Sequence, residues 1–196
     1  MMLGVDPFFR RFEQPLTLES LLAEQPQALL GVLQVIVRSQ RASRYAHDWA
    51  FARHDRNVEE VALAALLHDL AEILLWCFAP QLASEIRSRL QGDRTLRSAR
   101  AQQALLGFPL SELQLALCRN WHLPELLTTM MDDDNAHLAR VQNVQLAVRL
   151  ARHSLDDWTD PALLEDFTAI EELLHIDRET LLDRLQLAPE LLPRGS

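Results

Sequence analysis

The stretch AALLHDLAEILL, residues 64–75, places a histidine and an aspartate in the middle of an apolar helical run. Burying His68 and Asp69 is unfavourable unless other groups satisfy their polar atoms. Adjacent helical residues point about 100° apart, so both side chains could reach one ion at the end of a cleft. Imidazole and carboxylate together suit Zn, Fe, Mn or Mg, and Glu72 could orient the ring or be a further ligand. The alternative is a buried pair that only hydrogen-bonds to neighbouring helices.

The helix that carries this pair is expected to run from Val58 to Phe78, and it is apolar on almost every side. Asn57, followed three residues later by Glu60, is a capping-box variant at its start. A helix of this kind belongs at the centre of a bundle, so we expect it to be the most buried helix. The polar residues in its middle favour a buried helix over a membrane span.

The rest of the chain has helical periodicity nearly everywhere, without an alternating strand pattern. A helix is expected over residues 27–54, and the polar stretch 38–43 could break it in two. Its buried face is expected to hold Leu29, Leu30, Leu33, Val37, Ala46, Trp49 and Ala50. The fold class predicted is all-α, a compact bundle of about eight to ten helices. Further helix starts are expected at Thr17, Pro80, Asp93, Pro109, Pro124, Asp160-Pro161, Thr168 and Asp177.

The composition fits one soluble helical domain. The 196 residues are 48% apolar and include only five glycines, which favours helices over a sandwich or barrel. The net charge of −9 argues against nucleic acid or an anionic membrane as the main partner. All 19 basic residues are arginine, which excludes a P-loop or Schiff-base lysine. Cys77 and Cys118 form no CxxC motif, and with no signal-peptide pattern at the amino terminus they indicate a cytoplasmic protein.

The motif around His68 resembles the LLHDIG-type stretch of the HD superfamily of metal-dependent phosphohydrolases. The wider pattern is closer to the regulatory branch of that superfamily, the HDOD domain. Three segments carry the resemblance: residues 39–75, residues 106–131 with the turn Trp121-His-Leu-Pro124, and ELLHIDRETLLDRL at 172–185. It implies an HD-like helical domain over residues 39–190 and diverged amino-terminal helices over residues 1–38. Residues 191–196 resemble the protease-site remnant of an expression vector.

The departures from the HD pattern concern the metal ligands. The upstream histidine of the hydrolases falls near Ala42 or Ser43, and His47 comes one turn too late. Their later Asp falls at Val148, which cannot bind a metal, and Asp132-Asp133 stands where relatives often carry a His-His pair. Because metal affinity requires a closed set of ligands, the resemblance implies the fold and argues against hydrolysis. His68 and Asp69 are then vestigial, with no metal or cofactor; a bound metal would use these two and His47.

We therefore predict a non-catalytic regulatory module of bacterial signalling that acts through contacts with a protein partner. Nucleic acid and membrane are not expected as partners, and formation of a homo-oligomer is left open. The alternative is an active metal-dependent phosphohydrolase that uses His68 and Asp69 with His47 and one of Asp132 to Asp134. Two candidate binding surfaces are considered, an arginine segment and a turn that contains a tryptophan. The simpler interpretations are that the arginines form a solvated helix face and that the tryptophan belongs to the core. These surfaces comprise Arg87, Arg89, Arg94, Arg97 and Arg100, and the turn at Trp121.

Overall fold

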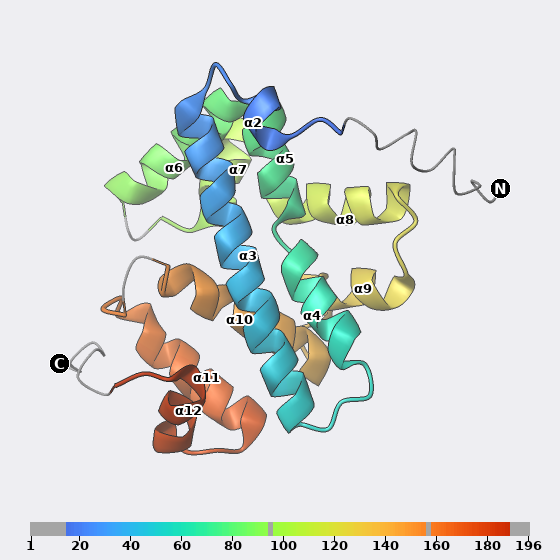
Figure 1. Ribbon diagram of the computed structural model, residues 1–196, viewed down its shortest axis with the longest axis vertical. Coiled ribbons are helices and arrows are strands. Elements are labelled where there is room, and N and C mark those ends of the chain that lie inside the picture. Colours follow the sequence, from blue (N-terminus) through green and yellow to red (C-terminus); the bar gives the residue numbers. More distant parts are fainter. Residues whose placement is uncertain (1–14, 94–95, 156–157, 189–196) are drawn as a thin grey trace.

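The computed structural model describes residues 15–93, 96–155 and 158–188, and every regular element in them is helical. This confirms the all-α prediction. The α-helices (Figure 1) are α2 (Leu18–Leu21), α3 (Pro26–Ala52), α4 (Val58–Leu67), α5 (Leu70–Phe78), α6 (Pro80–Gly92), α7 (Ser98–Leu106), α8 (Leu110–Asn120), α9 (Glu125–Met130), α10 (Ala139–His153), α11 (Ala162–Leu174) and α12 (Arg178–Leu185). A short 3-10 turn, η1 (Asp133–Asn135), precedes α10. The helix starts expected at Pro80, Pro109, Pro124 and Pro161 are confirmed, as are those at Thr17, whose hydroxyl accepts from the Ser20 amide, and Asp177, whose carboxylate accepts from the Thr180 amide. The starts expected at Asp93 and Thr168 are wrong, because α7 begins at Ser98 and Thr168 lies inside α11.

The longest helix, α3, is the spine of the molecule and crosses in front of its neighbours in Figure 1. It packs against α4, α5, α6 and α10. The expected break at residues 38–43 is wrong, because α3 is continuous from Pro26 to Ala52. Arg38 and Ser39 lie buried on the same face as Val35 and Ala42, since the charge of Arg38 is paired inside the protein. The boundary placed after residue 38 lies inside this helix.

The buried face of α3 differs from the expected face in the first half of the helix, whereas Ala46, Trp49 and Ala50 are buried as expected. Leu30, Leu33 and Val37 are 50%, 41% and 49% exposed. The buried positions are mostly small residues, which let neighbouring helices approach closely. At Gly31 an added Cβ would lie 2.8 Å from the ring of Trp76, so a side chain there would displace the indole that packs on α3. Small residues at the contacts therefore outweigh the larger apolar ones in setting the orientation of α3.

The predicted helix over residues 58–78 is two helices, α4 and α5, which meet at His68 and Asp69. The side chain of Gln114 on α8 bridges the junction. Its Oε1 accepts from the Ala71 amide at 2.9 Å, and its Nε2 donates to the Leu67 carbonyl at 2.8 Å. Backbone groups near the interruption thus find a partner in a third helix. The expected capping box is wrong as well, because the Asn57 side chain makes no cap bond.

Among the described residues, the stretch from Val58 to Phe78 is the one long and apolar enough, by composition, to cross a membrane. Its two halves pack against α3, and charged side chains meet at the junction in its middle. This is the arrangement of a core segment. The expectation that it is the most buried helix is wrong, because α10 buries eight of its fifteen residues, whereas α4 and α5 together bury six.

Two apolar cores lie along α3. One surrounds Trp49 and gathers side chains from the second half of α3, from α4 and from α9 to α12. The other surrounds Trp76 and gathers side chains from α2, the first half of α3, α5 and α6. Arg38 belongs to neither core, and it lies on α3 between Val35 of one and Ala42 of the other. The polar site described next therefore lies between two apolar regions.

Candidate functional site

The His-Asp pair lies at the junction of α4 and α5, where it meets an arginine from α3. The Nδ1 atom of His68 is 3.0 Å from Oδ1 of Asp69. On the other carboxylate oxygen, Oδ2, Arg38 donates from Nε at 2.9 Å and from Nη2 at 2.5 Å. The side chains of Arg38 and Asp69 are only 10% and 8% exposed. The expected pairing of His68 with Asp69 is confirmed, and the arginine is an addition that the sequence did not indicate.

Two more charged groups complete this cluster. Glu72 on α5 accepts from Arg38 at 2.7 Å, so it neither orients His68 nor completes a ligand set. Arg152 on α10 reaches Asp69 Oδ1 at 3.5 Å. Two guanidinium groups and two carboxylates thus balance one another, and they join α3, α5 and α10 at one point. This cluster of His68, Asp69, Arg38, Glu72 and Arg152 is called the junction cluster below.

The charges of the junction cluster fix its protonation. Burial alone would raise the pKa of Asp69, but the charge of Arg38, the hydrogen bond from His68 and the charge of Arg152 hold this pKa well below 3.8. Burial would lower the pKa of Arg38, but the facing carboxylates of Asp69 and Glu72 raise it above the ordinary value of a guanidinium instead. Both members of the pair are therefore ionised at neutral pH. Their charges are satisfied within the protein.

The residues present do not fit the metal that the HD superfamily binds. Nowhere in residues 15–93, 96–155 and 158–188 does a group of three or more His, Cys, Asp or Glu side chains lie close enough to hold one ion. Oδ2 of Asp69 faces the cationic Arg38, which would repel a metal ion. Val148, at the position of the later Asp of the hydrolases, is buried and carries no donor atom.

The alternative ligands are engaged elsewhere. His47 is about half exposed and faces Glu59 at 3.5 Å on the outside of α3. Asp132 caps the 3-10 turn by accepting from the Asp134 amide at 3.1 Å. Asp133 accepts from Gln145 of α10 at 2.8 Å. The structure does not bring these residues together with His68, so no step of a metal-assisted hydrolysis can be derived from them.

A second group with the same residue types lies between α10 and α11. The carboxylate of Asp166 is fully buried. Its Oδ2 lies 2.5 Å from Nδ1 of His153, and its Oδ1 lies 2.6 Å from Nη2 of Arg149. The contact with Arg149 is an ion pair that lacks the angle of a hydrogen bond, since Oδ1 accepts no hydrogen bond. We call these three residues the α10–α11 cluster. The ring of His153 is thus satisfied within this cluster.

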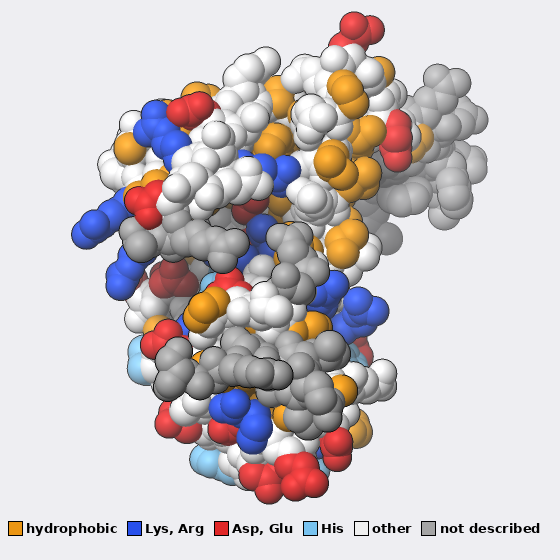
Figure 2. Space-filling model, turned by 90° about the vertical axis from the view of Figure 1, so that its left-hand side faces the viewer, with side chains coloured by type: hydrophobic (Ala, Val, Ile, Leu, Met, Phe, Trp, Pro, Cys, Tyr) orange, Lys and Arg blue, Asp and Glu red, His pale blue; other side chains and the backbone are white. Residues whose placement is uncertain are grey.

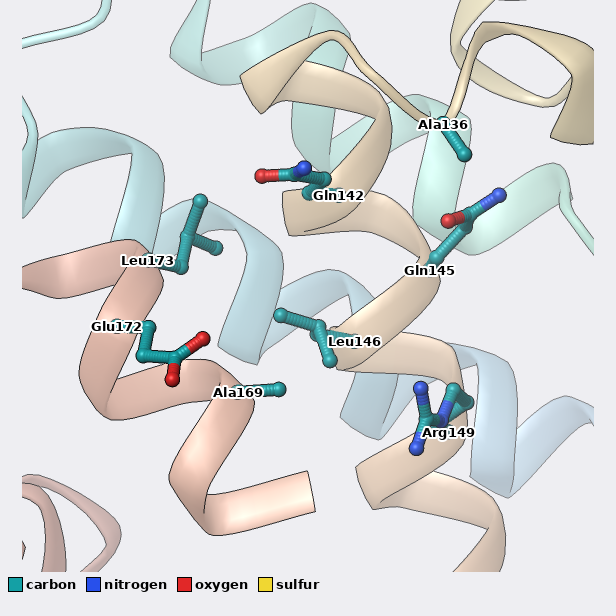
Figure 3. A pocket seen from close by; sticks show the side chains of 8 residues that line it. All are labelled: Ala136, Gln142, Gln145, Leu146, Arg149, Ala169, Glu172 and Leu173. Atoms are coloured by element: carbon teal, nitrogen blue, oxygen red, sulfur yellow. The ribbon is translucent and has the colours of Figure 1, made fainter. Parts of the chain in front are cut away.

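A pocket of about 360 Å³ lies beside this second cluster (Figure 3). Gln142, Gln145 and Arg149 of α10 line one side, and Glu172 and Leu173 of α11 line the other. The positive charge of Arg149 is already taken by Asp166, and Glu172 adds a negative charge to the same pocket. The pocket therefore lacks an unpaired positive charge that would bind an anion.

The arginine segment is not one continuous basic patch. Arg87 lies over the ring of Trp76 at 4.5 Å, and Arg89 pairs with Glu85 at 2.9 Å. Arg97, the N-cap residue of α7, and Arg100 on α7 are exposed, and Arg94 lies outside the described residues. On the face shown in Figure 2, basic and acidic side chains are interspersed. A solvated arginine face accounts for much of this segment.

The turn between α8 and α9 is more exposed than the sequence indicated. Trp121 is 48% exposed, so its assignment to the core is wrong. The following residue, His122, adopts a positive φ of 54°, and the Leu123 amide donates to the Cys118 carbonyl at 3.0 Å. Pro124 then starts α9. The backbone of the turn is thus fixed on both sides of an exposed indole.

The comparisons with known proteins agree with this geometry. The sequence matches the HDOD domain family over residues 10–137. The fold is similar to that of an HDOD domain protein of unknown function from Geobacter sulfurreducens, with 21% identity and a TM-score of 0.60. That match covers 78% of this chain and 58% of the other, so the chain spans less than two thirds of its relative.

A second similar crystal structure is that of a "putative phosphohydrolase" from Shewanella amazonensis SB2B. The identity is 14% and the TM-score 0.59, and the match covers 91% of this chain and 75% of the other. No curated protein matches the sequence. At these identities the two structures show a shared fold and nothing about activity.

Proposed function

Because the chain belongs to the HDOD domain family, we propose that it is a non-catalytic regulatory module that acts through protein–protein contacts in bacterial signalling, in the cytoplasm. The observation that carries this proposal is the guanidinium of Arg38 on the carboxylate of Asp69. In a hydrolase of the HD type this carboxylate would have to face a metal ion. Here it faces a cation that belongs to the protein.

The ion pair between Arg38 and Asp69 has a structural role here, in place of the catalytic role that the aspartate has in the hydrolases. A buried carboxylate with a guanidinium partner is retained only if both are well hydrogen-bonded, and Asp69 receives bonds on both oxygens. The pair holds α3 against the junction of α4 and α5, where helical hydrogen bonding is interrupted. In this proposal the His-Asp motif stabilises the fold, and the surface of the protein binds the partner.

Two surface features support recognition of a protein partner. Trp121 offers a large exposed side chain on a turn whose backbone is already fixed, which reduces the entropy lost on binding. Arg97 and Arg100 are exposed at the start of α7 and would attract an acidic partner over a longer range. Neither nucleic acid nor a membrane is proposed as a ligand, given the net charge of −9.

The absence of catalysis is tested with purified protein, Mn²⁺ or Mg²⁺, and two substrates: a chromogenic phosphodiester and a cyclic dinucleotide. We expect no turnover above that of the metal alone. His68→Ala is the test variant, and His122→Ala, at the distant turn, is the matched control. Turnover that His68→Ala abolishes and His122→Ala preserves, in folded proteins, would establish the phosphohydrolase instead.

The binding role is tested once a partner has been captured from the native cell and purified. Charge reversal at Arg97 and Arg100 should slow association, and the effect should shrink at high salt because exposed charges are screened. Trp121→Ala should mainly accelerate dissociation, since it removes an anchor. If neither variant changes either rate constant while the protein stays folded, the partner binds a different surface.

A further inference from the structure

One face of α3 has a regularly spaced series of exposed residues that do not belong to the core. From Leu30 to Phe51, exposed residues follow one another at alternating steps of three and four. Leu30, Leu33 and Val37 begin the series, and Phe51, which is 69% exposed, ends it. Leu30, Leu33 and Val37 were expected on the buried face, and the structure leaves them exposed. We call this series, over residues 30–51, the α3 seam.

Alternating steps of three and four are the spacing at which two helices pack along their length. A series with an average step of 3.5 residues stays on one side of a helix and meets the same series of a partner at a crossing angle near 20°. The α3 seam extends over six such steps, about 30 Å of helix. Scattered apolar residues on a surface are ordinary, but apolar residues at both ends of one seam fit a helical partner.

We propose that the α3 seam is the contact between two copies of this chain, which pack with their α3 helices antiparallel. This inference holds whether or not the module is catalytic, so it goes beyond the proposed function. The seam is apolar at its ends and polar in its middle, where Gln40, Arg44 and His47 are exposed. That distribution is what selects the orientation.

A parallel pair would place Arg44 beside Arg44 of the other copy and leave like charges in contact. In the antiparallel register that places Leu33 opposite Phe51, the amide of Gln40 falls opposite the guanidinium of Arg44. An amide oxygen accepts from a guanidinium, so the polar middle becomes complementary. The same register places Val37 opposite the side chain of His47. Two-fold symmetry repeats each of these pairs.

The charged residues that flank the seam do not oppose this approach. Arg41 is turned toward α10, where its Nη1 donates to the Ser154 carbonyl at 2.6 Å. Asp48 faces Arg184 of α12 at 3.2 Å. Both charged side chains therefore have polar partners within the same chain. Because α3 crosses in front of the helices around it (Figure 1), a second helix can approach along its length.

The size of the seam makes the expected dimer weak. A strip about 30 Å long and one helix wide is smaller than the roughly 800 Å² per partner of a standard interface. We therefore expect reversible dimers with a dissociation constant on the order of 10–100 μM. Sedimentation velocity of the full chain across that range should show the mass rising from 22.4 kDa toward twice that value.

Two variants test the assignment to the seam. Leu33→Glu with Val37→Glu should weaken the dimer about tenfold or more, because the interface loses two apolar side chains and the carboxylate at position 33 would have to be buried opposite Phe51 of the other copy. Phe78→Glu is the matched control, since Phe78 is 73% exposed and belongs to α5 rather than to the α3 seam, and it should leave the dimer unchanged. Helical content and Tm of both variants should match those of the wild type, since all three positions are exposed.

The orientation is tested by disulfide trapping in a Cys77→Ser background. Leu33→Cys combined with Phe51→Cys should give a covalent dimer under mild oxidation, and Leu33→Cys alone should not. A covalent dimer from Leu33→Cys alone would indicate a parallel pair and contradict the proposed register.

Three other results would overturn the proposal. A wild-type chain that stays monomeric at ten times the expected dissociation constant has no such dimer. A dimer that survives Leu33→Glu with Val37→Glu uses another face. A monomer that dimerises only after deletion of residues 1–14 would show that the amino-terminal segment, with Phe8, Phe9 and Phe12, occupies the seam instead.

Discussion

The junction cluster and the α10–α11 cluster contain the same three residue types in different settings. In the first, His68 and Asp69 are adjacent in sequence, and Arg38 comes from a different helix. In the second, the histidine and the arginine are one turn apart on α10, and Asp166 comes from α11. Only the first matches a motif that a reader of the sequence would mark as catalytic.

Burial of the arginine is the physical difference between them. The side chain of Arg38 is 10% exposed, whereas that of Arg149 is 44% exposed. Asp69 therefore depends on Arg38, which water cannot replace, whereas the partner of Asp166, Arg149, is already in contact with water. The junction cluster also has support from Gln114, which bridges the backbone around it. The comparison teaches that a His-Asp dipeptide becomes a metal site or an internal ion pair according to what faces the carboxylate.

Removal of Arg38 should have the largest effect on stability. Arg38→Met leaves the Asp69 carboxylate buried without its main partner, and breaking a buried pair costs about 3–5 kcal/mol. Asp69→Ala should cost a few kcal/mol as well, since it strands the guanidinium and the imidazole. Urea unfolding measures both. The double variant Arg38→Met with Asp69→Leu should recover part of the loss. Single variants within about 0.5 kcal/mol of the wild type would contradict the account.

The pH dependence should reveal a part of that same contribution. The pKa of Asp69 is lower in the folded state than its ordinary value near 3.9. The stability that it adds is therefore present above about pH 4 and is lost as the pH falls through the depressed folded value. The difference in unfolding free energy between the wild type and Asp69→Asn should be flat above that point and shrink at lower pH. A difference that grows as the solution is acidified would contradict the stated pKa direction.

Truncation of Gln114 should have a smaller effect that belongs to the junction cluster alone. Gln114→Ala leaves the Ala71 amide and the Leu67 carbonyl without their partner, which costs about 1–3 kcal/mol. Amide hydrogen exchange at Ala71 should accelerate. Unchanged exchange there would mean that the glutamine does not support the junction.

Truncation of Asp166 should have the smallest effect of the set. Asp166→Ala should cost about 1–2 kcal/mol, because Arg149 and His153 can turn to solvent once their partner is gone. If Asp166→Ala destabilises as much as Arg38→Met, exposure of the arginine does not distinguish the two clusters. The same unfolding experiment measures both variants.

Much of the fold could be predicted because its signals are local. Helical periodicity and the starts at Pro80, Pro109 and Pro124 need only neighbouring residues, and so does the cap at Asp177. The interruption between α4 and α5 could not be predicted this way, since the side chain that bridges it, Gln114, lies 43 residues beyond Ala71.

In the candidate site, too, the local contacts could be predicted and the contacts between residues distant in sequence could not. The motif identified His68 and Asp69, and their mutual contact is local. Arg38 lies 31 residues away from Asp69, and its place in a polar stretch suggested a helix break. One signal was available, because Arg38 lies in phase with Val35 and Ala42 on the buried face of α3. A charge at a core position of a helix predicts a buried partner.

The central claim is that Arg38, rather than a metal ion, neutralises the charge of Asp69. Calorimetric titration of the wild-type protein with Mn²⁺ at neutral pH tests it most directly. The account predicts no saturable binding at one ion per chain, for the wild type and for Asp69→Asn alike. Stoichiometric Mn²⁺ binding by the wild type that both Asp69→Asn and His68→Ala abolish, while His122→Ala retains it, would contradict the account.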